Sequence, residues 1–191
     1  MFRYLKPFFQ FLWEVAKVAL LSLAIILPVR YFLVQPFYVK GASMEPNFMD
    51  HDYLLIDELS FRFRTPAHGE VIVFHYPKDP RQYFIKRVVG LPGDRVVVRD
   101  GAVWVGAGGG DLKPDAEPYL DSAVRTQPES PTYSDVVLLP NQYFVMGDNR
   151  SASLDSRSFG PVTKQEIIGR IWVRGWPFSR LALYHPGVVT P

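Results

Sequence analysis

The feature that most constrains this chain is an apolar stretch near its start. From Val15 to Val34 the residues are almost all Leu, Ile, Ala and Val, and a helix needs about twenty such residues to cross a bilayer. The central part, Val18 to Val29, has no charged residue and only Ser22 as a polar one. It therefore lacks the polar face of an amphipathic helix in a soluble protein, and the stretch favours a membrane-spanning helix over a buried one.

The flanking residues indicate that this helix stays attached to the chain. Lys17 and Arg30 bracket the uncharged part and are expected to extend toward the headgroups, and Glu14, one turn before Lys17, is placed to pair with it. No Ala-x-Ala-like cleavage site follows the stretch, which predicts an anchor that is not removed. Positive charge is similar on the two flanks, so charge alone does not set the orientation. The residues concerned are Arg3, Lys6, Arg30 and Lys40.

Composition narrows the chemistry available to the remaining chain. A length of 191 residues fits one globular unit plus the anchor, and a net charge of +2 gives no basic footprint for nucleic acid. The chain has no cysteine, which excludes thiol nucleophiles, disulfides and Cys-ligated zinc. Its four histidines are scattered without metal-ligand spacing. We therefore expect no nucleic-acid partner, no metal and no cofactor.

Beyond Lys40, short runs of Val, Ile, Tyr and Phe alternate with Pro, Gly and Asp, which is typical of an all-β domain. Asp100-Gly101 supplies the two positive φ angles of a tight hairpin. From Asp111 to Ser134 we expect a surface loop, and no long helix after the anchor. The predicted strands are Tyr53–Asp57, Val71–Tyr76, Tyr83–Val89, Arg95–Arg99, Ala102–Val105, Val136–Leu139, Tyr143–Met146 and Ile168–Val173.

Two segments offer a candidate nucleophile and a candidate base. Ser43 lies between Gly41, which permits close approach, and Pro46, which stiffens the exit; a nucleophilic serine needs such a rigid backbone, although a plain turn has the same composition. In the predicted strand Tyr83–Val89, alternation places Lys86 on an apolar face and Arg87 on the opposite face. Desolvation there would lower the lysine pKa from about 10.4 toward neutrality. The alternative is a solvated lysine at a sheet edge.

A third segment, from Met146 to Val162, is rich in serine, aspartate, arginine and asparagine and is bracketed by Gly147 and Gly160. Its composition predicts a hydrogen-bond network packed against the sheet, with a solvated loop as the alternative. The three segments read G-x-S-M-x-P, K-R-x-x-G-x-P-G-D and G-D-N-R-x-x-S-x-D-S-R-x-x-G in this order. Together with the anchor, they resemble the signature of type I signal peptidases.

The resemblance implies a role for each matched residue. Ser43 would be the nucleophile, with its own backbone N–H in the oxyanion hole, Lys86 the general base, and Ser153 the residue that orients the lysine amine. Structural support of the site would come from two ion pairs. These pairs are Asp148 with Arg87 and Asp155 with Arg157.

Two positions depart from the family pattern. Gly41 has no hydroxyl where some members place a second oxyanion donor, and Asn47 replaces a common threonine. The second donor is therefore not identified from the sequence, whereas the Ser-Lys dyad is unaffected.

The resemblance also implies the architecture and the activity. Residues 1–36 would form the cytoplasmic tip and anchor, and residues 37–191 an extracytoplasmic, mainly antiparallel β catalytic domain with a small β-rich insertion at about 99–139. The protein would be a single-pass plasma-membrane endopeptidase whose partners are the lipid bilayer and the signal peptides of exported preproteins. An aromatic and cationic patch is available to contact the membrane surface, and the alternative is that its aromatic residues are buried in the core. Its residues are Phe61, Phe63, Trp172, Trp176 and Phe178 with Arg62, Arg64, Arg174 and Arg180.

Other functions remain open at this stage. One is a specialised Ser-Lys processing peptidase, of the conjugation or mitochondrial inner-membrane type. A self-cleaving repressor shares the chemistry but would carry a DNA-binding segment in place of the anchor. A membrane-tethered β domain that only binds peptides is the alternative outside enzymes, and it would gain nothing from a lysine on an apolar strand face.

Overall fold

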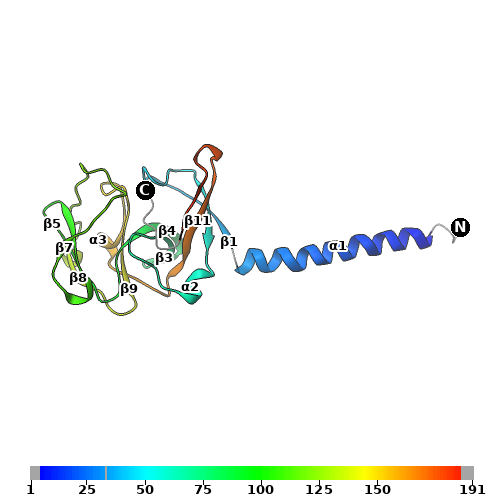
Figure 1. The fold of residues 1–191 in the computed structure, drawn as a ribbon, viewed down its shortest axis with the longest axis horizontal. Helices are drawn as coiled ribbons and strands as arrows, with labels where there is room; N and C mark the ends of the chain where they lie inside the picture. Colours follow the sequence, from blue (N-terminus) through cyan, green and yellow to red (C-terminus); the bar gives the residue numbers. More distant parts are fainter. Residues whose placement is uncertain (1–4, 33, 186–191) are drawn as a thin grey trace.

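The structure is a computed structural model that describes residues 5–32 and 34–185. Its first element, α1 (Leu5–Phe32), projects away from a β domain (Figure 1). Pro7–Leu27 is long and apolar enough to cross a membrane, and none of it is buried within the chain. Lys17 Nζ and Glu14 Oε1 form the expected ion pair at 2.8 Å. Arg3, one of the predicted flanking charges, lies outside the described residues.

The larger sheet forms the body of the β domain and has only antiparallel pairings. Its strand order is β1-β2-β11-β3-β4-β9-β10, and β12 pairs with β11. Buried side chains of β2, β3 and β11 pack with Met44 and Phe48, which lie in the connection between β1 and β2. The strands are β1 (Val34–Tyr38), β2 (Tyr53–Asp57), β3 (Val71–Tyr76), β4 (Asp79–Gly90), β9 (Gln142–Met146), β10 (Val162–Thr163), β11 (Ile167–Trp176) and β12 (Ala182–Leu183).

The smaller sheet lies at the end of the β domain farthest from α1 (Figure 1). Its order is β7-β6-β5-β8, with β5 (Arg95–Arg99), β6 (Ala102–Gly106), β7 (Lys113–Pro114) and β8 (Asp135–Val137). Asp100 and Gly101 join β5 to β6 with φ of 53° and 77°, as predicted. The sheet thus runs from residue 95 to residue 137, which overlaps the insertion expected at 99–139.

Among the described residues that follow α1, every helix is short. These helices are α2 (Ser60–Phe63), α3 (Ser156–Phe159) and the 3-10 turns η1 (Ala107–Gly109), η2 (Pro131–Tyr133) and η3 (Phe178–Arg180). All eight predicted strands are present, with ends that differ by up to four residues. The prediction of a mainly antiparallel β fold after an N-terminal apolar helix is therefore confirmed.

Three differences from the sequence-based expectations have physical reasons. The sequence analysis missed β1, because it continues directly from the apolar run and contains Pro36, which is tolerated there at the sheet edge. The expected surface loop is irregular as predicted, yet it buries Tyr119 and Thr126. Phe61 is wrong as a membrane-facing residue, because it is buried in a core cluster with Phe74 and Phe159.

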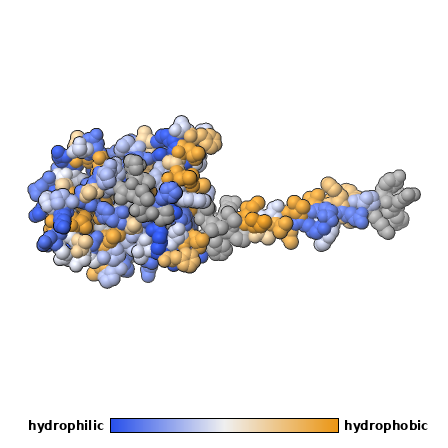
Figure 2. Space-filling model, in the orientation of Figure 1, coloured by the Kyte–Doolittle hydropathy of each residue, from blue (hydrophilic) through white to orange (hydrophobic). Residues whose placement is uncertain are grey.

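The other four aromatic residues of the predicted patch are exposed. Phe63 and Phe178 are the most exposed, at 83% and 73%, and Trp172 and Trp176 are each about half-exposed. Figure 2 shows apolar side chains gathered along α1 and on the part of the β domain next to it. Figure 2 thus places this apolar surface on α1 and on the adjoining part of the domain.

Candidate active site

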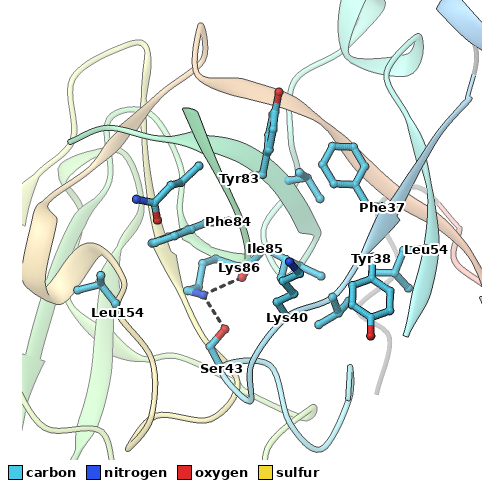
Figure 3. A pocket seen from close by; sticks show the side chains of 13 residues that line it. Phe37, Tyr38, Lys40, Ser43, Leu54, Tyr83, Phe84, Ile85, Lys86 and Leu154 are labelled. Atoms are coloured by element: carbon cyan, nitrogen blue, oxygen red, sulfur yellow. Dashed lines mark hydrogen bonds between the residues drawn. The ribbon is translucent and has the colours of Figure 1, made fainter. Parts of the chain in front are cut away.

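The centre of the site is a contact between Lys86 on β4 and Ser43 in the connection between β1 and β2. Lys86 Nζ lies 2.7 Å from Ser43 Oγ, and its second hydrogen bond goes to the carbonyl oxygen of Ile85 at 2.9 Å. Figure 3 shows the lysine extending along the groove toward the serine hydroxyl. Two residues 43 positions apart in the sequence are thus within hydrogen-bonding distance.

Ser43 is held by packing below it and hydrogen bonds around it. The next residue, Met44, and the nearby Phe48 are fully buried in the core, which fixes the turn on the sheet. On the opposite side, Asn149 donates from its backbone N–H to the Ser43 carbonyl and from its side-chain amide to the Ala42 carbonyl, both at 3.1 Å. Residues 41–46, the turn that carries the predicted nucleophile (the nucleophile turn), are therefore held between the hydrophobic core and the loop that follows β9.

Lys86 occupies an environment that disfavours its charge. It is only 3% exposed, and its amine lies 5.3 Å from the centre of the Phe84 ring. Burial lowers the pKa of Lys86 from 10.5 to about 8, while the carboxylates of Asp155 and Asp148 act in the opposite direction. A neutral amine is thereby accessible slightly above neutral pH, as a lysine base requires.

The backbone N–H of Ser43 is available for a developing oxyanion. Within residues 5–32 and 34–185, no group accepts a hydrogen bond from the backbone N–H of Ser43. The backbone N–H of Gly41, by contrast, donates to Asp50 Oδ1 at 2.9 Å. Gly41 therefore supplies neither a hydroxyl nor a free amide as the second oxyanion donor.

Arg87, next to the lysine, forms a buried pair with Asp148. Its Nε and Nη2 atoms donate to the two carboxylate oxygens at 2.8 and 2.6 Å, and both side chains are 1% exposed. Its guanidinium also lies 3.9 Å from the centre of the Tyr119 ring. Asn47 donates to Asp148 Oδ2 at 2.8 Å and to the Tyr119 carbonyl at 2.9 Å. This pair therefore joins the turn, β4 and the insertion.

The second predicted pair stiffens the loop after β9. Arg157 donates from Nε and Nη2 to the two oxygens of Asp155 at 2.9 and 2.8 Å. The backbone N–H of Gly147 donates to Asp155 Oδ2 at 3.1 Å, and that of Val145 donates to Ser156 Oγ at 2.9 Å. The loop is therefore bonded to the end of β9 rather than solvated.

Ser153 lies in the site, but the structure shows no hydrogen bond between it and Lys86. Its Oγ atom is buried and, among the described residues, has no hydrogen-bond partner. A Cβ atom added at Gly147 would overlap both the Ser153 side chain and the Ser43 carbonyl oxygen. The serine hydroxyl therefore approaches the backbone beneath the nucleophile turn, with two unused lone pairs.

A groove of about 570 Å³ opens beside the dyad. Its walls come mainly from β1 and β4, with Leu154 closing one side (Figure 3). Within the part of the chain that the structure describes, no group of three or more His, Cys, Asp and Glu side chains is placed to hold a metal ion. The chemistry open to this site is thus that of a serine hydroxyl beside a desolvated amine, with a free amide N–H: the arrangement of an acyl-transfer nucleophile.

The sequence analysis missed two residues that support the site. Asn47 was noted only as a departure from the family pattern, and Asn149 only as part of a polar loop, yet both bond to the nucleophile turn or its supports. The available signal was position, because Asn149 lies inside the third motif and Asn47 directly follows the first. Their partners lie about 72 to 107 residues away along the chain, and sequence spacing gives no such pairing.

Comparison with protein families gives one match that spans most of the chain. The family described as "Signal peptidase, peptidase S26" matches residues 12–176. This range contains α1 from Leu12 onward, every strand of both sheets except β12, and all seven predicted site residues.

Individual relatives agree with that match. A probable signal peptidase I-2 from Synechocystis sp. is 34% identical over 175 residues, covering 89% of this chain and 76% of the relative. A signal peptidase I from Leptolyngbya laminosa is 35% identical, covering 92% and 85%, and a signal peptidase IB from Staphylococcus aureus is 31% identical, covering 83% and 86%. A crystal structure of a signal peptidase I from Enterococcus faecalis V583 is 29% identical with a TM-score of 0.43, covering 56% of this chain and 97% of that one.

Proposed function

The chain belongs to the signal peptidase family, peptidase S26, and on that premise we propose that it removes N-terminal signal peptides from exported preproteins, with Ser43 as nucleophile and Lys86 as general base. The observation that carries the assignment of the dyad is the 2.7 Å separation of Lys86 Nζ and Ser43 Oγ at a lysine that is 3% exposed. A lysine with a merely structural role would be expected to pair with a carboxylate or to reach water.

The proposed reaction begins with Lys86 in its neutral form. Its lone pair accepts the Ser43 hydroxyl proton as the serine oxygen attacks the carbonyl carbon of the scissile bond. The negative charge that develops on the carbonyl oxygen is stabilised by the free backbone N–H of Ser43. When the C–N bond breaks, the Lys86 ammonium returns its proton to the leaving amine, which departs as the new N-terminus.

Hydrolysis of the acyl-enzyme completes the cycle. Lys86, neutral again, takes a proton from a water molecule that attacks the ester carbon, and the Ser43–acyl bond breaks with return of the proton to Ser43. The roles proposed for the remaining matched residues are indirect. Ser153 orients the amine, and the Asp148–Arg87 and Asp155–Arg157 pairs hold the two loops together.

The groove supports a preference for small side chains next to the cut. Phe84, Ile85 and Leu154 form apolar walls beside the dyad, and Lys40 is the charged side chain that lines the groove besides Lys86. Selection would act by exclusion, because a shallow apolar pocket rejects a group that is too large or cannot be solvated.

We further propose that α1 anchors the protein in the plasma membrane as a single span, with residues 1–36 as tip and anchor and residues 37–191 on the extracytoplasmic side. The exposed apolar surface of α1 supports the anchor, since none of Pro7–Leu27 packs against the β domain. Trp176 and Phe178 are exposed on the surface of the β domain and would enter the interfacial region, where aromatic side chains are favoured.

The test is to incubate the detergent-solubilised protein with a purified preprotein and to sequence the new N-terminus of the product. We expect one cut, directly after a small residue that follows the signal segment. A Ser43→Ala variant purified in the same way serves as the control for contaminating proteases. An uncut preprotein, or equal cutting by Ser43→Ala, would overturn the proposal.

A further inference from the structure

A second cavity, of about 450 Å³, borders the nucleophile turn and shares no lining residue with the groove beside the dyad. The first groove uses residues that precede Ser43, whereas this cavity uses Glu45 and Pro46, which follow it. Its other walls come from the loop after β9, through Asn149 and Ser151, and from the insertion, through Leu120 and Val124. The two cavities are thus bordered by opposite ends of the same turn.

The wall that the insertion contributes is tied firmly to the site. Arg150, buried at 4% exposure, forms an ion pair with Glu117 and a hydrogen bond to the hydroxyl of Thr126. Asn47 donates to the carbonyl of Tyr119, next to Leu120. Residues 120–125 are therefore held on both sides by contacts to the loops that carry the site, so the cavity has a fixed shape.

The two cavities differ in where they lie relative to the anchor. The first groove is bordered by β1, which follows α1 directly, whereas the second is bordered by the insertion, at the end of the domain farthest from α1 (Figure 1). A signal segment that lies in the membrane reaches Ser43 from the side of the anchor. The chain beyond the cut must then leave toward the insertion.

Distance allows a short stretch of substrate to reach this second cavity. Glu45 is two residues from Ser43, so their Cα atoms are at most about 7.6 Å apart. An extended peptide advances about 3.3 Å per residue. The second or third residue after the cut would therefore arrive at the cavity mouth.

We propose that this cavity binds the first residues of the mature protein, in extended form, on the far side of the scissile bond. The inference rests on the proposed function and adds a specificity site to it. Leu120 and Val124 offer an apolar contact to one substrate side chain. Arg125 also lines the cavity and donates hydrogen bonds to the carbonyls of Ser122 and Val124. Its guanidinium would donate a further hydrogen bond to a carbonyl oxygen of the substrate backbone.

The test uses two synthetic substrates that are identical up to the first residue after the cut. One ends there, and the other continues to the eighth residue with native mature sequence. We expect the wild-type protein to cleave the long substrate with the higher kcat/KM, through a lower KM. Val124→Glu should lower kcat/KM for the long substrate by about tenfold, the size expected for loss of one apolar contact. The same variant should leave kcat/KM for the short substrate unchanged. Val124→Ala should give the same pattern more weakly.

Val137→Glu is the matched control, because Val137 is 64% exposed on β8 of the same insertion and does not line the cavity. This variant should change kcat/KM for neither substrate. Equal cleavage of the two lengths by the wild-type protein, or an equal loss on both substrates in the two Val124 variants, would overturn this inference alone. If the wild-type protein cleaved neither substrate, the proposed function would fail and this inference with it.

Discussion

The amine of Lys86 and the hydroxyl of Ser43 lie 2.7 Å apart in a part of the β domain that leaves the lysine 3% exposed. The cost of keeping an ammonium there is expressed in its pKa, which burial lowers from 10.5 to about 8. Activity and stability should therefore both depend on pH, in ways that a solvated lysine would not produce.

The first prediction concerns the pH dependence of cleavage. Only neutral Lys86 accepts the Ser43 proton, so kcat/KM should rise about tenfold per pH unit below a pKa of about 8 and level off above it. The measurement is kcat/KM of a short peptide substrate from about pH 6 to about pH 10. A flat profile over this range, or an inflection near about 6.5 as for a histidine base, would contradict the role of Lys86.

The second prediction concerns stability. Below a pH of about 8 Lys86 is protonated in both states, and the folded protein bears the desolvation cost. Between about 8 and 10.5 the unfolded chain holds more protons than the folded one, so the free energy of unfolding rises with pH. Lys86→Met removes this dependence and should be inactive at every pH.

The measurement is urea unfolding of wild type and Lys86→Met from about pH 7 to about pH 11. The wild-type free energy of unfolding should rise by about 3 kcal/mol relative to the variant as pH increases through this window, since one pKa unit corresponds to about 1.36 kcal/mol. Ser43→Ala, which keeps the lysine, is the control and should retain the rise. Parallel curves for wild type and Lys86→Met would mean that the amine is not desolvated.

Local pattern was sufficient to predict much of the fold. Alternation in β4 placed Lys86 and Arg87 on opposite faces, and the structure has Lys86 beside Phe84 while Arg87 meets Asp148. The hairpin at Asp100 follows from the same kind of local signal, because two positive φ angles are needed within two residues.

Contacts between distant segments could not be predicted in this way. Asn47 meets Asp148 and Tyr119, which are 101 and 72 residues away, and no periodicity relates these positions. The burial of Tyr119 is also of this kind, because the segment around it has the composition of a loop whereas its ring packs on the distant Arg87 guanidinium. The family resemblance gave the Asp148–Arg87 pairing, but not the asparagine that links it to the nucleophile turn.

The third prediction compares two ion pairs of the same geometry. Arg87–Asp148 and Arg95–Asp135 each have two hydrogen bonds, of 2.8 and 2.6 Å and of 2.8 and 2.5 Å. Both side chains of the first pair are 1% exposed, whereas both side chains of the second pair are 47% exposed. Asp148→Ala removes the carboxylate partner of a buried guanidinium and should lower the free energy of unfolding by about 3–5 kcal/mol. Asp135→Ala should lower the free energy of unfolding by less than about 1 kcal/mol.

Chemical denaturation of the two variants beside wild type measures both effects. Similar losses in Asp148→Ala and Asp135→Ala would show that burial does not govern the contribution of the first pair. Because the Arg87 pair also holds Asn47, Asp148→Ala should reduce cleavage even under conditions where the variant remains folded.

The fourth prediction concerns Gly147. A methyl group there would overlap Ser153 and the carbonyl of Ser43, so Gly147→Ala must displace the nucleophile turn and should reduce kcat at least about a hundredfold, as small misplacements of reacting groups do. Gly175→Ala is the control, because the nearest atom to its added Cβ is the Tyr53 carbonyl oxygen at 3.9 Å. The measurement is kcat for peptide cleavage by the two variants. Near-wild-type activity in Gly147→Ala would mean that displacement of the turn around Ser43 does not impair cleavage.

The last prediction separates a positioning role of Ser153 from a structural one. Lys86 donates one N–H to the Ile85 carbonyl and lies 2.7 Å from Ser43 Oγ. In the proposed reactive state its lone pair accepts the Ser43 proton, which leaves the second N–H of the neutral amine in need of an acceptor. The Ser153 Oγ atom is buried with no partner among the residues described, and we expect it to accept this hydrogen bond from Lys86. Ser153→Ala removes an unsatisfied hydroxyl, so stability should be unchanged or slightly higher.

Activity should respond in the opposite direction. Without the acceptor the amine is free to rotate away from Ser43, and kcat should fall about a hundredfold while KM for a short peptide stays constant. Thermal unfolding and steady-state kinetics on the same preparation measure the two effects. If Ser153→Ala lost stability and activity together, the hydroxyl would be a packing element. If it lost neither, Lys86 would be oriented by the Ile85 carbonyl alone.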